Sequence, residues 1–327
     1  MDLINIFIRR IKGIFCGSYY RSYKFRRQRA ANQRHCFDFP PENNGWRKIR
    51  ATPVYGDETT SSIFDPFVFI ENDKFIMIVS ERLNHGIDRL ESEDGIHWDK
   101  TATILRRIPD TWQSIVNRAT LVFHDGLWHM WYTGQFNNSA CIGHTISKDG
   151  FSFHNANEPC LKAEMKAEGV SVMNPCVLWN EKKLCFQMWY AAGEDYEPDV
   201  LFYAESNDGD KWVKHSEPVL TKLLSHEWEK AKVGGCDVKQ KADGTYEMYY
   251  IGYQNVDVAR ICYATSKDGI HWERTEKNLL LGPSKGHFDS DATYKPAVIE
   301  NNNKLCMWYN GRSGNEEYIG LAIKEVQ

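Results

Sequence analysis

The motif Met-Trp-Tyr recurs along this 327-residue chain and limits the folds that the chain can adopt. It stands at 130–132, 188–190 and 307–309, with Met-Tyr-Tyr at 248–250 and a weaker copy, Phe-Ile-Met-Ile, at 75–78. A second motif, Ser-x-Asp-Gly followed by an aromatic residue, comes after each of the first four copies, at 92–98, 147–153, 206–212 and 266–272. The repeat is roughly 55–60 residues long, a little above typical propeller-blade repeats. The sequence therefore predicts an array of similar supersecondary units.

Each repeat contains four strand-like pieces. A short apolar run such as 119–123 leads into a polar turn such as 124–126, which is a strong hairpin signal. The Met-Trp-Tyr piece, an alternating piece such as 142–146, and the residues after the Asp-Gly turn supply the other three strands. Four antiparallel strands repeated five times predict an all-β, five-bladed β-propeller.

The two ends of the repeated region complement each other. The fifth repeat stops after its third strand, near Ala322, and residues 43–49, with Trp46, look like an unattached fourth strand. We expect this N-terminal strand to complete the last blade, because closure removes the open sheet edge. The predicted domains are a propeller over 41–327 and an N-terminal extension over 1–40.

The extension differs in charge from the rest of the chain. Residues 1–35 carry nine Lys and Arg against Asp2, a net +8, which leaves −12 for the remainder of a chain whose total is −4. Residues 1–15 are too short and too charged to span a bilayer, and they lack the order of a secretory signal. They suit a basic amphipathic helix on an anionic membrane surface. A helix packed on the propeller, or an unstructured tail, fits equally well.

These features predict a cytoplasmic protein, which the membrane alternative would place at the inner membrane face. A nucleic-acid partner is disfavoured because the acidic body would oppose it. The nine cysteines include no CxxC pair, and five lie in apolar strand patterns, so we expect reduced, buried thiols. No Cys/His cluster has the spacing of a zinc site, and no calcium ligand set is evident. We therefore predict no metal and no cofactor.

Candidate ligand-binding residues come from the first strand of each repeat, because the innermost strands of a propeller surround its central channel. When these strands are aligned, one position holds Asp65, Arg118, Asn174, Gly235 and Lys295. Charges at a channel mouth are costly unless they are paired or used on a ligand. We expect a ligand site there; a purely structural polar plug is the alternative.

A second repeated element precedes this position by six or seven residues in three repeats. It places an aromatic residue in the segment that enters the blade, at Trp112, Trp228 and Phe288. Aromatic rings there could stack on sugar rings, or they could pack between blades.

The Asp65-Pro66 pair, the Met-Trp-Tyr hairpins and the Asp-Gly turns resemble the five-bladed glycosidase superfamily. This superfamily includes glycoside hydrolase families 43 and 32 and the family 130 mannoside phosphorylases, and the resemblance covers about residues 43–325. It implies a glycosidase acting in the central pocket, with Asp65 as general base or nucleophile. The family's second Asp and its acid Glu do not carry over, because Arg118, Asn174 and Gly235 occupy the matching places.

Glycoside hydrolysis normally needs two carboxylates, so other acidic residues near the mouth are candidates. The predicted catalytic set is Asp65, Asp237, Glu168 and Asp291. The predicted substrate-binding set is Arg118, Asn174, Lys295, Trp112, Trp228 and Glu81. An Asp beside Arg118 and Lys295 should stay ionised, which suits a base or nucleophile.

Two cations in one mouth also suit an anionic group such as phosphate, a sugar carboxylate or a phosphosugar, unless they only neutralise Asp65. Three hypotheses follow. The first is a glycoside hydrolase acting on an oligo- or polysaccharide. The second is a sugar-binding or sugar-transferring propeller, a transferase or phosphorylase, in surface-polysaccharide biosynthesis, tethered to a membrane through residues 1–35. The third is a degenerate site that only binds glycan.

Overall fold

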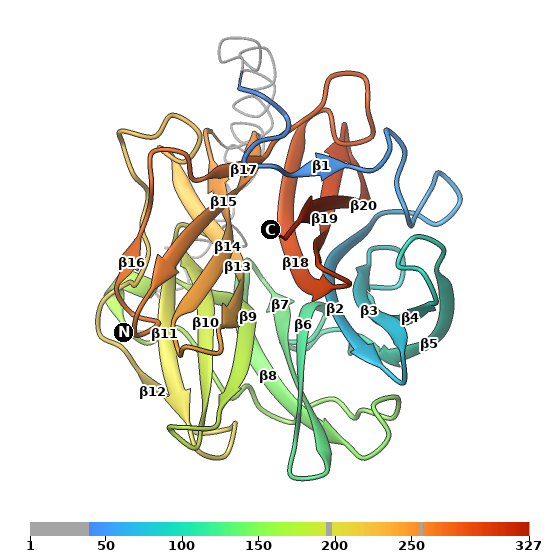
Figure 1. Ribbon diagram of the computed structural model, residues 1–327. Coiled ribbons are helices and arrows are strands. Elements are labelled where there is room, and N and C mark those ends of the chain that lie inside the picture. Colours follow the sequence, from blue (N-terminus) through green and yellow to red (C-terminus); the bar gives the residue numbers. More distant parts are fainter. Residues whose placement is uncertain (1–38, 194–197, 256–257, 327) are drawn as a thin grey trace, which may run out of the picture.

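A computed structural model describes residues 39–193, 198–255 and 258–326. Five antiparallel sheets surround one axis, and the chain passes from the blue strands of blade 1 to the red strands of blade 5 (Figure 1). The first strand of each blade is the inner one: β2 (Ile63–Glu71), β6 (Ile115–His124), β9 (Ser171–Asn180), β13 (Lys232–Gln240) and β18 (Ala292–Asn301). The prediction of an all-β, five-bladed propeller is confirmed.

The remaining strands lie outward in sequence order. Blade 1 adds β3 (Lys74–Glu81), β4 (Gly86–Ser92) and β5 (Asp99–Leu105), and blade 2 adds β7 (Leu127–Phe136) and β8 (Ser139–Ser147). Blade 3 adds β10 (Cys185–Gly193), β11 (Val200–Ser206) and β12 (Val213–Lys214). Blade 4 adds β14 (Tyr246–Tyr253), β15 (Ala259–Ser266), β16 (Trp272–Glu273) and β17 (Leu279–Leu281), and blade 5 adds β19 (Lys304–Ser313) and β20 (Glu316–Glu325).

The N-terminal strand closes the ring, as predicted. β1 (Arg47–Lys48) pairs antiparallel with β20, and Lys48 lies opposite Ala322. The Lys48 ammonium is 2.5 Å from the Asp289 carboxylate of the same blade. The predicted membrane-surface helix, and all of the extension except residues 39 and 40, lies outside the described residues.

Blade 2 departs from the expected four strands. Phe153 was predicted to open a fourth strand, but the segment after the turn makes only an isolated bridge between Leu161 and Ile142. Side-chain hydrogen bonds hold this segment in place of a strand ladder. The Gln113 side-chain amide donates to the Ala156 carbonyl at 2.8 Å, and the Asn155 side chain donates to the side-chain oxygen of Gln113 at 2.8 Å. In blade 4 the fourth position is instead divided between β16 and β17, which both pair with β15.

The Trp of the Met-Trp-Tyr motif explains why the two repeated motifs occur together. Its indole N–H donates to the glycine carbonyl of an Asp-Gly turn in the next blade, as in Trp131 to Gly209 (2.9 Å), Trp189 to Gly269 (2.7 Å) and Trp308 to Gly95 (2.9 Å). Each of these glycines has a φ between 74° and 82°. A Cβ added at Gly269 would lie 2.9 Å from the Trp189 ring. The motif therefore joins blade 2 to blade 3, blade 3 to blade 4 and blade 5 to blade 1.

The Tyr of the same motif makes a second repeated contact. Its hydroxyl donates to a side chain in the segment that enters the blade: Tyr132 to Gln113 (2.6 Å), Tyr190 to Glu168 (2.8 Å), Tyr250 to Glu229 (2.6 Å) and Tyr309 to Asp289 (3.0 Å). We call these four partners the lock acceptors; all are at most 2% exposed. Burial raises the pKa of each of the four tyrosines, so their hydroxyls remain donors.

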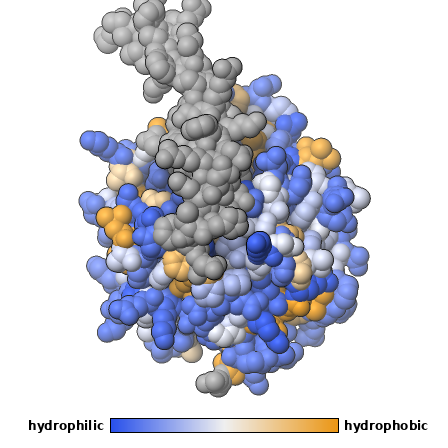
Figure 2. Space-filling view, turned by 90° about the horizontal axis from the view of Figure 1, so that it is seen from above, coloured by the Kyte–Doolittle hydropathy of each residue, from blue (hydrophilic) through white to orange (hydrophobic). Residues whose placement is uncertain are grey.

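Two features of the surface bear on the sequence predictions. The face visible in Figure 2 is mainly hydrophilic, and its apolar residues are scattered. Within the described ranges, no helix has the length and apolar character needed to cross a bilayer. The seven described cysteines are all free thiols, and four of them are buried.

Candidate active site at the mouth of the ring

The aligned position on the inner strands has an unusual backbone conformation. Asp65, Arg118, Asn174 and Lys295 all have φ between 45° and 59°, and the pairing register of each inner strand shifts at this point. Bulges redirect side chains, and a left-handed conformation costs a non-glycine residue about 1–3 kcal/mol. The same strain at four equivalent positions points to a functional role for these residues. We call Asp65, Arg118, Asn174, Gly235 and Lys295 the ring residues, and their arrangement around the axis the ring. The fifth member, Gly235, lacks this φ.

The ring amides are held by side chains that the sequence reasoning missed. The residue directly after Met-Trp-Tyr, or its equivalent in blade 1, accepts the ring N–H of the next blade: Ser80 from Arg118 (2.9 Å), Thr133 from Asn174 (2.9 Å) and Asn310 from Asp65 (2.8 Å). In blades 3 and 4 the position is Ala191 or Ile251, which cannot accept. The alignment of the repeats does mark this position, because it is polar in blades 1, 2 and 5 and apolar in blades 3 and 4.

Asp65 is enclosed by its partners. One carboxylate oxygen forms an ion pair with the Lys295 ammonium, and the other accepts a hydrogen bond from the Ser80 hydroxyl at 3.1 Å. The Asp65 side chain is fully buried, whereas that of Lys295 is 19% exposed. The Lys295 ammonium also lies 5.0 Å from the centre of the Phe64 ring, within cation–π range. Lys295 therefore covers the carboxylate at the mouth, which we define as the end of the ring where the inner strands begin.

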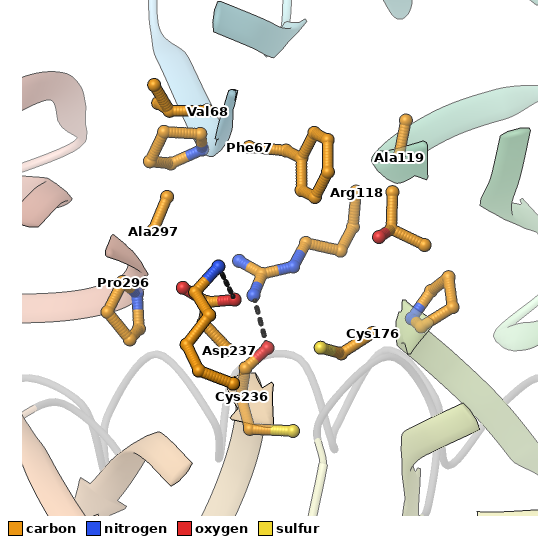
Figure 3. Close-up of a pocket in the computed structure, with 13 residues that line it drawn as sticks. Phe67, Val68, Arg118, Ala119, Cys176, Cys236, Asp237, Pro296 and Ala297 are labelled. Carbon is orange, nitrogen blue, oxygen red and sulfur yellow. Dashed lines mark hydrogen bonds and ion pairs between the residues drawn. The ribbon is translucent and has the colours of Figure 1, made fainter. Parts of the chain in front are cut away.

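Arg118 extends across the axis beneath the ring. Its guanidinium donates to the Cys236 carbonyl of blade 4 at 2.9 Å, and the residue is 4% exposed (Figure 3). The cavity beside it is about 10 Å³, room for about one water molecule. Arg118 therefore fills the channel below the ring.

Asp237, a predicted catalytic residue, lines this lower cavity and not the mouth. Its carboxylate accepts the Val298 N–H at 2.6 Å and lies 3.0 Å from the Lys239 ammonium. These contacts connect blades 4 and 5.

Glu168, also predicted to be catalytic, is a lock acceptor with no exposed side-chain surface. Burial raises its pKa, but hydrogen bonds from the Met165 and Glu164 amides, Tyr190 and Lys214 outweigh this effect, and the net pKa lies below the ordinary value. The ionised side chain stabilises the short helix η2 (Lys166–Glu168) against the blade.

The two predicted aromatic platforms also pack within blades. Trp112 stacks on Tyr132 at an interplanar angle of 15°, and the Trp228 indole donates to Asn278 at 2.9 Å. Trp112 also lies so close to Gly134 that a Cβ there would come within 2.5 Å of its ring. The geometry favours the packing alternative over sugar stacking for both residues.

Glu81, the last residue of β3, and Asp291, directly before β18, each accept the amides of a nearby turn. Glu81 accepts the amides of Leu83 (2.6 Å) and Asn84 (2.8 Å). Asp291 accepts the Gly314 amide at 2.7 Å and lies 3.5 Å from the Arg312 guanidinium.

Glu317, at the mouth end of β20, is a carboxylate that the sequence reasoning missed. Its two oxygens accept from the Tyr294 hydroxyl (2.6 Å) and the Asn310 amide (3.2 Å), and Arg82 lies 3.4 Å away. Because the Asn310 side chain also accepts the main-chain N–H of Asp65, it connects the backbone of Asp65 to the carboxylate of Glu317. The repeats did not single out Glu317, since the equivalent position holds Asp199 in blade 3 but Ala140 and Ala259 in blades 2 and 4. Among the residues described, no group of three or more His, Cys, Asp or Glu is arranged to hold a metal ion.

Comparison with known proteins agrees with this architecture. The model of the glycosyl hydrolases family 32 N-terminal domain matches residues 88–240. The chain is 28% identical over 211 residues to an uncharacterized protein of Mycobacterium tuberculosis (strain CDC 1551 / Oshkosh), covering 63% of this chain and 67% of that one. It is 34% identical over 158 residues to a 1,2-beta-oligomannan phosphorylase of Thermoanaerobacter sp. (strain X514), covering 45% and 48%.

Solved structures share the fold. A thermostable family-43 glycoside hydrolase has a TM-score of 0.66 at 18% identity, covering 80% of this chain and 89% of that one. A structure described under the GH130 family of mannoside phosphorylases, which contains hydrolases that target beta-1,2 mannosidic linkages, has a TM-score of 0.65 at 13% identity, covering 87% and 95%. The predicted resemblance is confirmed: the chain is a glycoside-hydrolase-like five-bladed propeller.

Proposed function

We propose that this propeller is a carbohydrate-active enzyme that cleaves a glycosidic bond at the mouth of the ring. The observation that carries the proposal is the Asp65–Lys295 pair, a buried carboxylate covered by a partly exposed cation at two strained ring positions. Buried charges held in strained backbone are typical of functional sites. The family and fold comparisons support the same class of chemistry.

In this proposal Asp65 and Glu317 are the two carboxylates of the reaction. Asp65 acts as base or nucleophile once it is uncovered. Glu317 is 12% exposed at its side chain and binds a sugar hydroxyl or exchanges a proton with it. Asn310 sets their relative position, since it contacts both residues.

Lys295 has the role of a cover that an anion displaces. An anionic ligand at the mouth would attract the ammonium away from Asp65 and so expose the carboxylate. Phosphate suits this role because it accepts charge-assisted hydrogen bonds from Lys and Arg. Arg82, which is 50% exposed beside Glu317, offers a second cation.

We therefore propose phosphorolysis of a β-1,2-linked manno-oligosaccharide, the substrate class in the name of the Thermoanaerobacter relative. The bond between C1 and the glycosidic oxygen breaks, a bond from C1 to an oxygen of hydrogen phosphate forms, and the leaving oxygen takes the proton that the phosphate gives up. Hydrolysis is the second candidate, with water in place of phosphate; it is favoured by the family 32 match and by the hydrolases among the structural neighbours.

The test incubates the full chain with β-1,2-mannobiose and longer oligomers, with and without inorganic phosphate. We expect mannose 1-phosphate to form only when phosphate is present. Free mannose, formed at the same rate without phosphate, would establish the hydrolase instead. Absence of any cleavage across a wider panel of oligosaccharides, together with retained binding, would overturn the enzyme proposal and favour the glycan-binding hypothesis.

The membrane tether remains a separate proposal. It rests on the net +8 of residues 1–35. Flotation with anionic liposomes should be lost when residues 1–35 are removed. Equal flotation of both forms would contradict the tether and leave the enzyme proposal untouched.

A further inference from the structure

The seam between blades 4 and 5 lacks the indole–glycine contact described above. Tyr249 stands where blades 2, 3 and 5 carry the motif Trp, and blade 5 has no Asp-Gly turn because its fourth strand comes from the N-terminus. Trp46, just before β1, fills part of the place, with its ring edge-on to Tyr249 at 6.3 Å and 87°. The seam where the ring closes is therefore packed differently from the seams locked by a Trp.

This difference leaves a groove between the two blades, toward the end of the strands opposite the mouth. A cavity of about 350 Å³ lies there, with Trp46, Tyr249 and Leu280 at its floor and Asn44, Tyr263 and Lys324 around it. A second cavity of about 380 Å³ shares Glu247 and Tyr263 with the first. Each has the size of a small-ligand site, for which about 300–1,000 Å³ is typical. None of the ring residues lines either cavity.

Glu247 and Tyr263 supply the polar chemistry between the two cavities. The Tyr263 hydroxyl donates to the Glu247 carboxylate at 2.6 Å, which fixes the tyrosine ring. Burial raises the pKa of Tyr263, so the hydroxyl remains a donor. The Glu247 side chain is still 23% exposed, and its one ion pair, with Lys241 at 3.5 Å, is long. The carboxylate therefore keeps capacity to accept further hydrogen bonds.

The equivalent place in blade 3 shows what has changed. There Glu205, opposite Gln187, accepts from the Tyr203 hydroxyl at 2.5 Å and lies 2.6 Å from the Lys183 ammonium. In blade 4 the residue opposite Glu247 is the shorter Thr265, which lines the second cavity. The acidic group thus moves from one strand to the next, and the space that the longer side chain would fill remains open.

We propose that this groove is a second saccharide-binding site, separate from the mouth. An apolar sugar face packs against the Tyr263 ring, and sugar hydroxyls donate to Glu247 and contact Asn44 and Lys324. The class of ligand rests on the proposed function. The site holds a distant part of a long substrate while another part occupies the mouth, so it strengthens binding of long chains through effective concentration.

The test compares Tyr263→Ala and the conservative Glu247→Gln with a matched blade 3 control, Lys183→Ala, after thermal unfolding has shown that each is folded. Isothermal titration with β-1,2-manno-oligosaccharides of increasing length is the readout. We expect both groove variants to weaken binding of the longest oligomer at least fivefold and to leave that of the disaccharide unchanged, and we expect the control to match the parent chain. Unchanged affinity of both groove variants for every length would overturn the proposal.

Asp65→Asn separates this inference from the proposed function. This variant should retain the length-dependent binding and its sensitivity to Tyr263→Ala, even if no turnover is ever detected in the parent chain. If the length dependence disappears with Asp65→Asn alone, the second site does not exist and all binding belongs to the mouth.

Discussion

The lock acceptors and the ring residues both place charged groups inside the propeller, and they differ in how the blades use them. Four blades repeat one lock contact, a buried acceptor for the motif tyrosine. The ring position instead changes from blade to blade, from acid to base to amide to glycine. A contact that four of the five blades repeat serves the architecture. A position that shares its strained backbone but varies in its side chain is free to serve chemistry.

The exposure of the paired cations separates the two sets in the same way. The cations that neutralise Asp289, Glu168 and Glu229 are 4%, 10% and 11% exposed at their side chains. Lys295, the partner of Asp65, is 19% exposed. The lock pairs are thus more enclosed, whereas the ring pair has one member that a ligand can reach.

The largest expected effect distinguishes the two sets by activity. Asp65→Asn should lower kcat about 10³-fold, within the range for loss of an acid–base group, and leave the fold intact. Glu168→Gln, the same chemical change at a lock acceptor, should leave kcat per folded molecule within about twofold, as the order-of-magnitude contrast requires. Both variants are assayed in parallel. A larger loss of kcat in Glu168→Gln than in Asp65→Asn would contradict the assignment of catalysis to the ring and of structure to the lock acceptors.

The free energy of unfolding should depend most on the ion pairs of the lock acceptors. Lys48→Met leaves Asp289 buried without its cation and should cost about 3–5 kcal/mol of unfolding free energy, the usual result of breaking a buried pair. Lys241→Met, at a half-exposed pair, should cost under about 1 kcal/mol. Urea unfolding measures both, and equal costs would contradict the assignment of Lys48 as a structural cation.

A smaller loss is expected at the seam between blades 3 and 4. Trp189→Phe keeps an aromatic side chain but removes the indole N–H that donates to the Gly269 carbonyl. An unsatisfied buried acceptor costs about 1–3 kcal/mol. Thermal unfolding should detect the change while substrate affinity stays constant. A variant as stable as the parent chain would show that this hydrogen bond adds no measurable stability.

The smallest expected effect is a pH dependence that belongs to the lock. Because the native pKa of Glu168 is lowered, the unfolded state takes up its proton at higher pH than the folded state does. The stabilisation is complete above the unfolded value, about 4.3, and is lost as pH falls through the native pKa. Glu168→Gln should therefore flatten the decline of stability below about pH 4.3, as measured by unfolding across a pH series. If stability falls with pH as steeply in Glu168→Gln as in the parent chain, Glu168 does not contribute to the pH dependence.

The sequence predicted the fold and the ring because both follow from the repeat. Asp65 and Lys295 were recognised by their place in an aligned strand, and the strand position fixes the side-chain direction. Glu168 and Asp237 were chosen for their proximity in sequence to the ring, which does not determine which way a side chain turns. In the structure Glu168 accepts from the Tyr190 hydroxyl and Asp237 accepts the Val298 N–H. Glu317 lies on the third strand of its blade, where the repeat holds alanine in blades 2 and 4, so an alignment of the innermost strands could not reveal it.

The pairing of Lys48 with Ala322 also has a consequence in the cell. A ribosome adds about 5–20 residues per second, so β1 waits on the order of tens of seconds for its partner strand to be made. During that time blade 5 is incomplete and Trp46 has no final place to pack. A nascent chain that stops just before Glu316 would carry every ring residue, yet could never join its ends. Closure of the propeller therefore depends on the translation of β20, after the last ring residue has been made.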